Sequence, residues 1–181
     1  MIRAASLLVL ALGSGALFAD GPEVPRVPGE RSGVEQPWGA DSVVAGTWAL
    51  VSVDNILPDG SRVQLYGPEP VGLLIFDAGG RYSLQIFRRG RPRFASGDKG
   101  RGTAEENAAA VQGGNAHFGR YTVDAARRTL TFHVEHASFP NWEGADQARP
   151  FSLRGDVLTY TVPAPTTGRG ATGEVVWRRN R

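Results

Sequence analysis

The chain has 181 residues, no cysteine and a formal net charge of +2 at neutral pH. The lack of cysteine excludes disulfides, thiolate metal sites, a cysteine nucleophile and a lipid-anchored cysteine. The small positive charge is nearly all arginine and forms no basic stripe interleaved with aromatic residues, so it does not indicate nucleic-acid binding. A chain of this length is expected to form one domain with a sizeable core.

The first 44 residues divide into two segments. Residues 1–19 contain one basic residue, Arg3, followed by an apolar run, which is typical of a secretory signal peptide. A membrane anchor is the alternative, but the run is short for a bilayer span and is interrupted by glycine. Residues 20–44 are rich in proline and glycine and predict a disordered leader before a domain over 45–181. We therefore expect a secreted or periplasmic protein with no membrane span in its mature form.

The domain shows many short strand-like runs joined by tight turns. Residues 81–87 illustrate the pattern, because Tyr82, Leu84 and Ile86 alternate with polar residues and predict a sheet with one apolar face. A capping box over 103–106 predicts one short helix over 107–112. The other strand-like runs cover 46–53, 62–66, 71–77, 117–123, 128–135, 149–154, 157–162 and 174–179. Nearly all connections are of hairpin length, so we predict an all-β fold, an up-and-down antiparallel β-barrel with one short helix.

Several motifs occur in a fixed order along this domain: Gly46-Thr47-Trp48, the run 72–77, the run 133–142 and Trp177-Arg178-Arg179. Together they resemble the bacterial lipocalin-like domain family over about residues 45–179. The resemblance implies an up-and-down β-barrel with a central cavity for a small apolar molecule. It also implies that Trp48 lies at the closed end under an arginine of the last strand, for which Arg179 is favoured over Arg178. The departure from the family is His136, where relatives are expected to have a smaller residue.

The segment 133–149 concentrates the candidate ligand-binding residues. Phe139-Pro140-Asn141-Trp142 predicts a lid or portal, with Trp142 stacking on a ligand and Asn141 donating or accepting a directed hydrogen bond. The alternative is a rigid corner whose aromatic residues plug the barrel end. Arg149 could bind a ligand carboxylate bidentately or could pair with Asp146 or Glu135. The full set of predicted ligand-binding residues is His133, Glu135, Phe139, Asn141, Trp142 and Arg149.

Two histidines in this segment raise the question of catalysis or metal binding. His133 and Glu135 share a strand face and are candidates for an acid–base pair. If the opposite face of the strand is the apolar interior, however, both face solvent. His136 points away from them unless a bulge intervenes, so we predict no metal site and no cofactor. No Ser-His-Asp spacing or nucleophile elbow occurs.

The sequence therefore favours a barrel that binds a small hydrophobic molecule without converting it. An isomerase or cyclase that uses His133 or Glu135 for proton transfer is the alternative. A third possibility is an envelope protein that binds partners through the outer face of the barrel.

Overall fold

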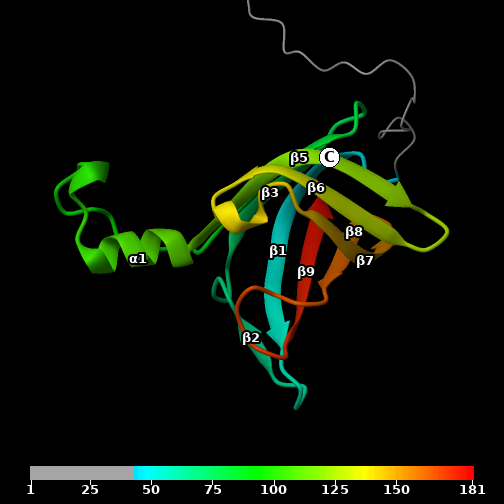
Figure 1. Ribbon diagram of the computed structural model, residues 1–181. Coiled ribbons are helices and arrows are strands. Elements are labelled where there is room, and N and C mark those ends of the chain that lie inside the picture. Colours follow the sequence, from blue (N-terminus) through cyan, green and yellow to red (C-terminus); the bar gives the residue numbers. More distant parts are fainter. Residues whose placement is uncertain (1–42) are drawn as a thin grey trace, which may run out of the picture. The chain divides into compact units, whose positions relative to one another are not determined.

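The computed structural model of the protein describes residues 43–181, so the predicted signal peptide and all but the end of the predicted leader lie outside the described residues. Nine strands and three short helices make up the domain (Figure 1). The strands are β1 (Gly46–Ile56), β2 (Arg62–Gln64), β3 (Val71–Phe76), β4 (Arg81–Phe87), β5 (Gly114–Asp124), β6 (Thr129–Ala137), β7 (Asp146–Arg154), β8 (Val157–Val162) and β9 (Thr172–Arg179). The helices are η1 (Lys99–Arg101), α1 (Ala104–Gln112) and η2 (Pro140–Trp142).

The strands form a closed antiparallel barrel. From β3 to β9 each strand pairs with the next one in sequence, and β9 returns to pair with β1. β1 is shared at its other edge, where its first residues pair with β3 and its last three pair with the short β2. Eight strands thus close the wall, and β2 extends it beyond the end of β3. The predicted up-and-down barrel is confirmed, because closure by neighbouring hairpins needs no crossover.

The helix α1 lies on the long connection between β4 and β5 (Figure 1). Both halves of the predicted capping box form: the Glu106 amide donates to Thr103 Oγ1 at 3.2 Å, and the Thr103 amide donates to Glu106 Oε2 at 2.9 Å. The helix starts at Ala104, three residues before the predicted start, because the first turn after the cap is itself helical. No residue of α1 is buried, so the helix adds little to the barrel core.

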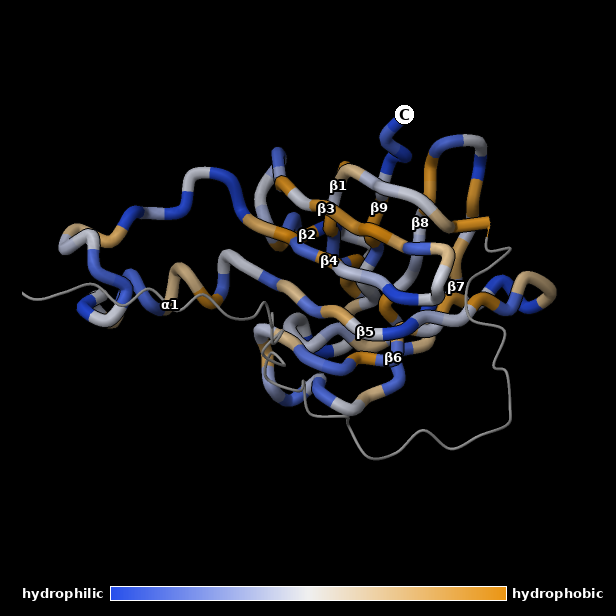
Figure 2. The backbone as a smooth tube through the Cα atoms, turned by 90° about the horizontal axis from the view of Figure 1, so that it is seen from above, coloured by the Kyte–Doolittle hydropathy of each residue, from blue (hydrophilic) through white to orange (hydrophobic). Residues whose placement is uncertain are grey.

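Side chains alternate between the interior and the exterior of the wall, as the sequence predicted. In β4, Tyr82, Leu84 and Ile86 are buried, and the residues between them are not. In Figure 2 hydrophobic and hydrophilic residues are likewise interleaved along the strands, whereas the segment that follows β4 towards α1 is mainly hydrophilic. This alternation gives the barrel an apolar lumen and a polar outer surface.

One end of the barrel is closed around Trp48. Its indole is fully buried, and Nε1 donates to the Val44 carbonyl at 2.9 Å. The Arg179 guanidinium lies 4.1 Å from the centre of the indole ring and donates to the carbonyls of Val43, at 2.9 Å, and Ala45. This is the tryptophan–arginine pair that the resemblance implied, and it combines a cation–π contact with capping of free carbonyls. Val43 and Val44, the last two residues of the predicted leader, are thus part of the closed end.

The lumen next to Trp48 is filled with aromatic rings. The centre of the Phe76 ring lies 4.6 Å from that of Tyr121 and 5.8 Å from that of Phe132, and Tyr82 meets Phe132 edge-on at 4.7 Å. The rings at this depth belong to several different strands, so the packing fixes the strands against one another. The closed half of the barrel is therefore a solid core.

Candidate ligand cavity

The other half of the barrel is hollow. A cavity of about 940 Å³ lies in it, and its walls come from strand positions on the far side from Trp48: Val53 and Asn55 follow Trp48 in β1, and Val175 precedes the buried Trp177 in β9. Drug-sized ligands occupy cavities of roughly 300–1,000 Å³. The apolar part of the lining includes Val53, Leu65, Leu84, Ile86, Phe132 and Val175.

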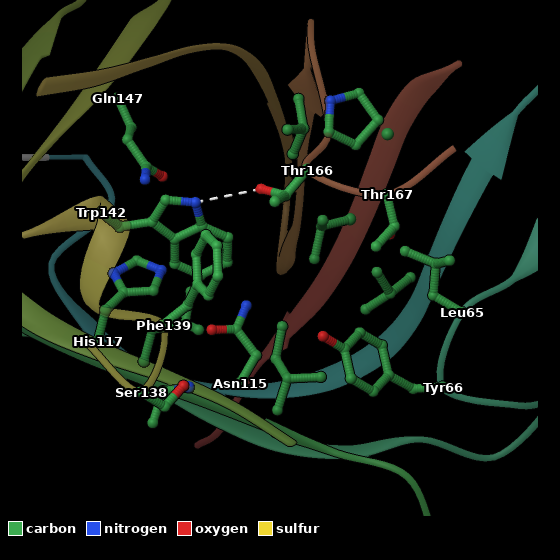
Figure 3. A pocket seen from close by; sticks show the side chains of 18 of the residues that line it. Leu65, Tyr66, Asn115, His117, Ser138, Phe139, Trp142, Gln147, Thr166 and Thr167 are labelled. Carbon is green, nitrogen blue, oxygen red and sulfur yellow. Dashed lines mark hydrogen bonds between the residues drawn. The ribbon is translucent and has the colours of Figure 1, made fainter. Parts of the chain in front are cut away.

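The predicted corner lies at this cavity. Phe139 and Trp142 both line it, with their rings 5.4 Å apart and edge to face. Trp142 Nε1 donates to Thr166 Oγ1 at 3.1 Å, so the indole is tied to the loop between β8 and β9 (Figure 3). Asn141, the third predicted residue of the corner, is exposed and is not among the lining residues in the described part of the chain. Of this corner, the two aromatic residues thus face the lumen and the amide does not.

The buried His117 lines the same cavity and is bonded to a buried tyrosine behind it. His117 Nδ1 and the Tyr82 hydroxyl lie 2.7 Å apart and share a hydrogen bond. Burial lowers the pKa of His117 to about 4, and the charge of Arg149 acts in the same direction. Burial also raises the pKa of Tyr82 well above its usual range. Both groups are therefore neutral near pH 7, and His117 presents a polar ring to the cavity without a charge.

Arg149 faces the lumen from β7. It pairs across the sheet with Leu130, which is fully buried, and directly opposed residues of adjacent strands share a face. Its Nη2 donates to Gln147 Oε1 at 2.5 Å, and its Nη1 donates to the Ala148 carbonyl at 3.1 Å. Burial lowers the pKa of Arg149, with the Tyr160 and Tyr82 hydroxyls opposing that effect, but an arginine keeps its charge at neutral pH.

His133 and Glu135 lie on the outside of the barrel and do not line the cavity. His133 is held between Asp146, with 2.7 Å from Nδ1 to Oδ1, and Thr122, with 3.0 Å from Nε2 to Oγ1. Glu135 forms an ion pair of 2.7 Å with Arg81 on the neighbouring surface. The structure therefore separates these two predicted residues from Phe139, Trp142 and Arg149.

A β-bulge interrupts the pairing of β5 and β6 at this point. Phe118 pairs with His136 and Gly119 pairs with Val134, so Glu135 is the extra residue. Gly119 fits there because a Cβ atom would come within 2.1 Å of the His133 carbonyl oxygen. The bulge does not bring His133, Glu135 and His136 together into a metal site. His136 instead contacts Glu143, with 3.4 Å between Nδ1 and Oε1. Within residues 43–181, no group of three or more histidine, aspartate and glutamate side chains is placed to hold a metal ion.

Sequence reasoning missed two polar residues of the cavity lining, His117 of β5 and Gln147 of β7. Gln147 accepts a hydrogen bond from Arg149, and His117 bonds to Tyr82 of β4. A signal for His117 was available: it lies four positions before Tyr121, so an unbroken strand gives both residues the same face. The strand does begin before His117, at Gly114, three residues earlier than predicted. Gln147 faces inward because β7 begins at Asp146, earlier than the predicted start.

Two comparisons place these features among known proteins. Residues 45–180 match the sequence profile of a lipocalin-like domain, which spans the whole barrel. The 4'-hydroxy-3'-methoxypropiophenone carrier protein of Aspergillus oryzae is 31% identical to this chain over 105 residues, which is 54% of this chain and 95% of that protein. None of the helices within residues 43–181 has the length and the apolar character of a membrane-spanning helix.

Proposed function

The chain belongs to the lipocalin-like domain family, and we propose that it is a carrier that binds a small, mostly apolar molecule in the open half of its barrel and releases it unchanged. The observation that supports this proposal is the division of the lumen into a solid closed half and a cavity of about 940 Å³. A barrel that needed only stability would gain by filling the second half with side chains as well.

The lining favours a ligand with an aromatic ring. Phe139, Trp142 and Phe132 offer ring faces and edges to the lumen, and offset or edge-to-face contacts add to simple burial. A ring system that buries about 200 Å² of apolar surface gains roughly 5 kcal/mol from desolvation, before the entropic cost of association. The relative from Aspergillus oryzae is named as the carrier of an aromatic ketone, which fits this class of ligand.

Binding without turnover is also supported by the position of the titratable groups. The candidate acid–base pair, His133 and Glu135, lies outside the cavity with other partners. At the cavity wall, burial moves the pKa values of His117 and of its partner Tyr82 away from neutrality in opposite directions, whereas an effective general acid or base has a pKa near the working pH. The position of these groups therefore favours a carrier over an isomerase or cyclase.

Calorimetric titration with 4'-hydroxy-3'-methoxypropiophenone tests the proposal directly. We expect saturable binding to one site per chain, weakened about tenfold by Trp142→Ala, since one aromatic contact contributes about 0.5–1.5 kcal/mol beyond the burial of its surface. Phe118→Ala is the matched control, because Phe118 is an aromatic residue of the outer surface with 43% exposure. Native mass spectrometry of the protein from its source should also show a bound small molecule, and an empty protein that binds no aromatic compound would contradict the proposal.

We also propose that the protein is exported from the cytoplasm. It is supported by the sequence pattern of residues 1–19, with Arg3 before the apolar run. We expect the exported protein to have lost this segment, so that Edman sequencing of its N-terminus starts near residue 20. A protein recovered only in the cytoplasm with Met1 retained would contradict this part and would leave ligand binding untouched.

A further inference from the structure

We propose that the ligand carries a carboxylate, and that this group binds the guanidinium of Arg149 inside the cavity. The inference rests on the proposed carrier function and specifies the ligand class for it. It follows from the charge of the lumen, from the partners that Arg149 has and lacks, and from what happens when a ligand displaces water.

Of the three charged residues that line the cavity in the described part of the chain, Arg149 is the only one that is half-buried. The other two charged residues of the lining, Arg88 and Asp146, are exposed. Each of them has a partner of its own: Arg88 donates to the Leu65 carbonyl at 2.8 Å, and Asp146 binds His133 on the outer face. With His117 neutral, the cavity lining carries one net positive charge.

No acidic side chain among residues 43–181 pairs with Arg149. The two carboxylates that the sequence offered as its partners are engaged elsewhere, since Asp146 binds His133 and Glu135 binds Arg81. The guanidinium has five N–H donors, and the described residues accept from it only at Gln147 and at the Ala148 carbonyl. The side chain is thus held in place by neutral oxygens and keeps donors free for the lumen.

A ligand that fills the cavity must compensate this charge. In the empty barrel, water in the cavity can solvate the guanidinium, but an apolar ligand removes that water. Two neutral oxygens do not neutralise a cation that has lost its water, so a purely apolar molecule would forfeit part of the affinity that its own burial provides. A carboxylate offers two oxygens to the planar guanidinium fork and forms the strongest type of neutralising hydrogen-bonded pair.

The arrangement of the lining fits a molecule with an aromatic body and an acidic end. Figure 3 shows the ring of Trp142 near Gln147, whose carboxamide holds the Arg149 guanidinium, and His117 lies on the same side of the cavity. Leu65 and Tyr66 are drawn on the opposite side, away from these groups. An aromatic body can therefore lie between Trp142 and the apolar wall while its acid group reaches Arg149.

The test compares two ligands of nearly the same shape that differ in charge. Naphthalene-2-carboxylate and naphthalene-2-carboxamide are titrated calorimetrically into the wild-type chain and into Arg149→Met. In the wild type we expect the carboxylate to bind about 10–100-fold more tightly, because hydrogen bonds to a charged group are much stronger than those to a neutral amide. In Arg149→Met we expect the preference to disappear and the carboxamide to bind at least as well as before.

Arg154→Met is the matched control. Arg154 is an exposed arginine at the end of the same strand, and its substitution removes the same charge from the protein. It should retain the preference for the carboxylate. Arg149→Lys keeps the positive charge but lacks the two parallel N–H donors of the guanidinium, so it should retain only part of the preference for the carboxylate. This variant replaces Arg149→Met in the test if the methionine variant does not fold. Equal affinity of both ligands in the wild type, or a preference that survives unchanged in either Arg149 variant, would overturn the inference and leave the carrier function standing. If neither ligand nor any neutral aromatic compound binds, the carrier function itself is overturned, and the inference with it.

Discussion

The two halves of the barrel share one wall but differ in what their inward-facing side chains do. Around Trp48 the lumen is filled by large aromatic rings, and the arginine that covers it donates to main-chain carbonyls. Beyond Phe132 the inward side chains, Phe139 and Trp142 among them, line a cavity of about 940 Å³ instead of filling the lumen. The same alternation of strands thus produces a structural core in one half and a binding site in the other.

This difference indicates how stability and function are separated along each strand. In β5, Tyr121 is fully buried among the closed-half rings, whereas His117 of the same strand lines the cavity. A change in the closed half should therefore act mainly on the free energy of unfolding. A change in the open half should act mainly on binding or on its dependence on pH.

The largest effect that we expect is the loss of Trp48. Trp48→Ala leaves a large void in a solid core and leaves the Val44 carbonyl and the Arg179 guanidinium without their contact, so the free energy of unfolding should fall by about 4 kcal/mol. Trp142→Ala removes a half-buried indole of the open half and should cost only about 1–2 kcal/mol. Urea denaturation measures both, and equal losses for the two tryptophans would contradict the division of the barrel into two halves.

The next effect is a dependence of stability on pH that arises in the open half. Burial lowers the pKa of His117 to about 4 from an ordinary value of 6.5, so between these values the unfolded chain binds more protons than the folded one. The stabilisation is fully present above pH 6.5 and is lost as the pH falls to about 4. The total loss over this range is roughly 3 kcal/mol.

Denaturation curves at pH 7.5 and pH 4 should show this loss in the wild type. In His117→Gln, whose amide can still bond to the Tyr82 hydroxyl, most of the loss between the two pH values should vanish. His136→Gln is the control, since His136 is an exposed histidine of the neighbouring strand. A His117→Gln variant that retains the full pH dependence would show that other groups cause it.

The closed half was easier to predict from the sequence than the open half. Alternation in residues 81–87 and the ordered motifs around Trp48 were sufficient for the barrel and its closed end, because core packing follows directly from the pattern of apolar residues. The cavity residues depend on details that the pattern does not contain. Whether His133 or Arg149 faces inward depends on strand register, and the two lie on opposite faces of the paired strands β6 and β7. The bulge at Glu135 and the early start of β7 have no clear signal in the sequence.

A smaller effect is expected for the arginine that covers Trp48. Arg179→Met removes a cation–π contact and two hydrogen bonds to main-chain carbonyls but retains most of the apolar stem, so we expect a loss of about 1–2 kcal/mol. Arg178→Met changes the adjacent, exposed arginine and should change the stability by less than about 0.5 kcal/mol. Thermal unfolding of the two variants separates them, and a larger effect at Arg178 would contradict the role assigned to Arg179.

The smallest effect on stability is expected at the helix that contributes to the cavity lining. Thr103→Ala removes the N-cap of α1 and should destabilise the helix itself by about 1 kcal/mol. Because no residue of α1 is buried, global unfolding in urea should shift by less than about 0.5 kcal/mol, while hydrogen exchange of the α1 amides should become faster. Ala110 and Val111 of this helix line the cavity, so a bound aromatic compound should also dissociate faster from this variant. A change in dissociation without a change in global stability is what distinguishes the open half from the closed half, whereas a global loss comparable to that of Arg179→Met would assign α1 to the structural core.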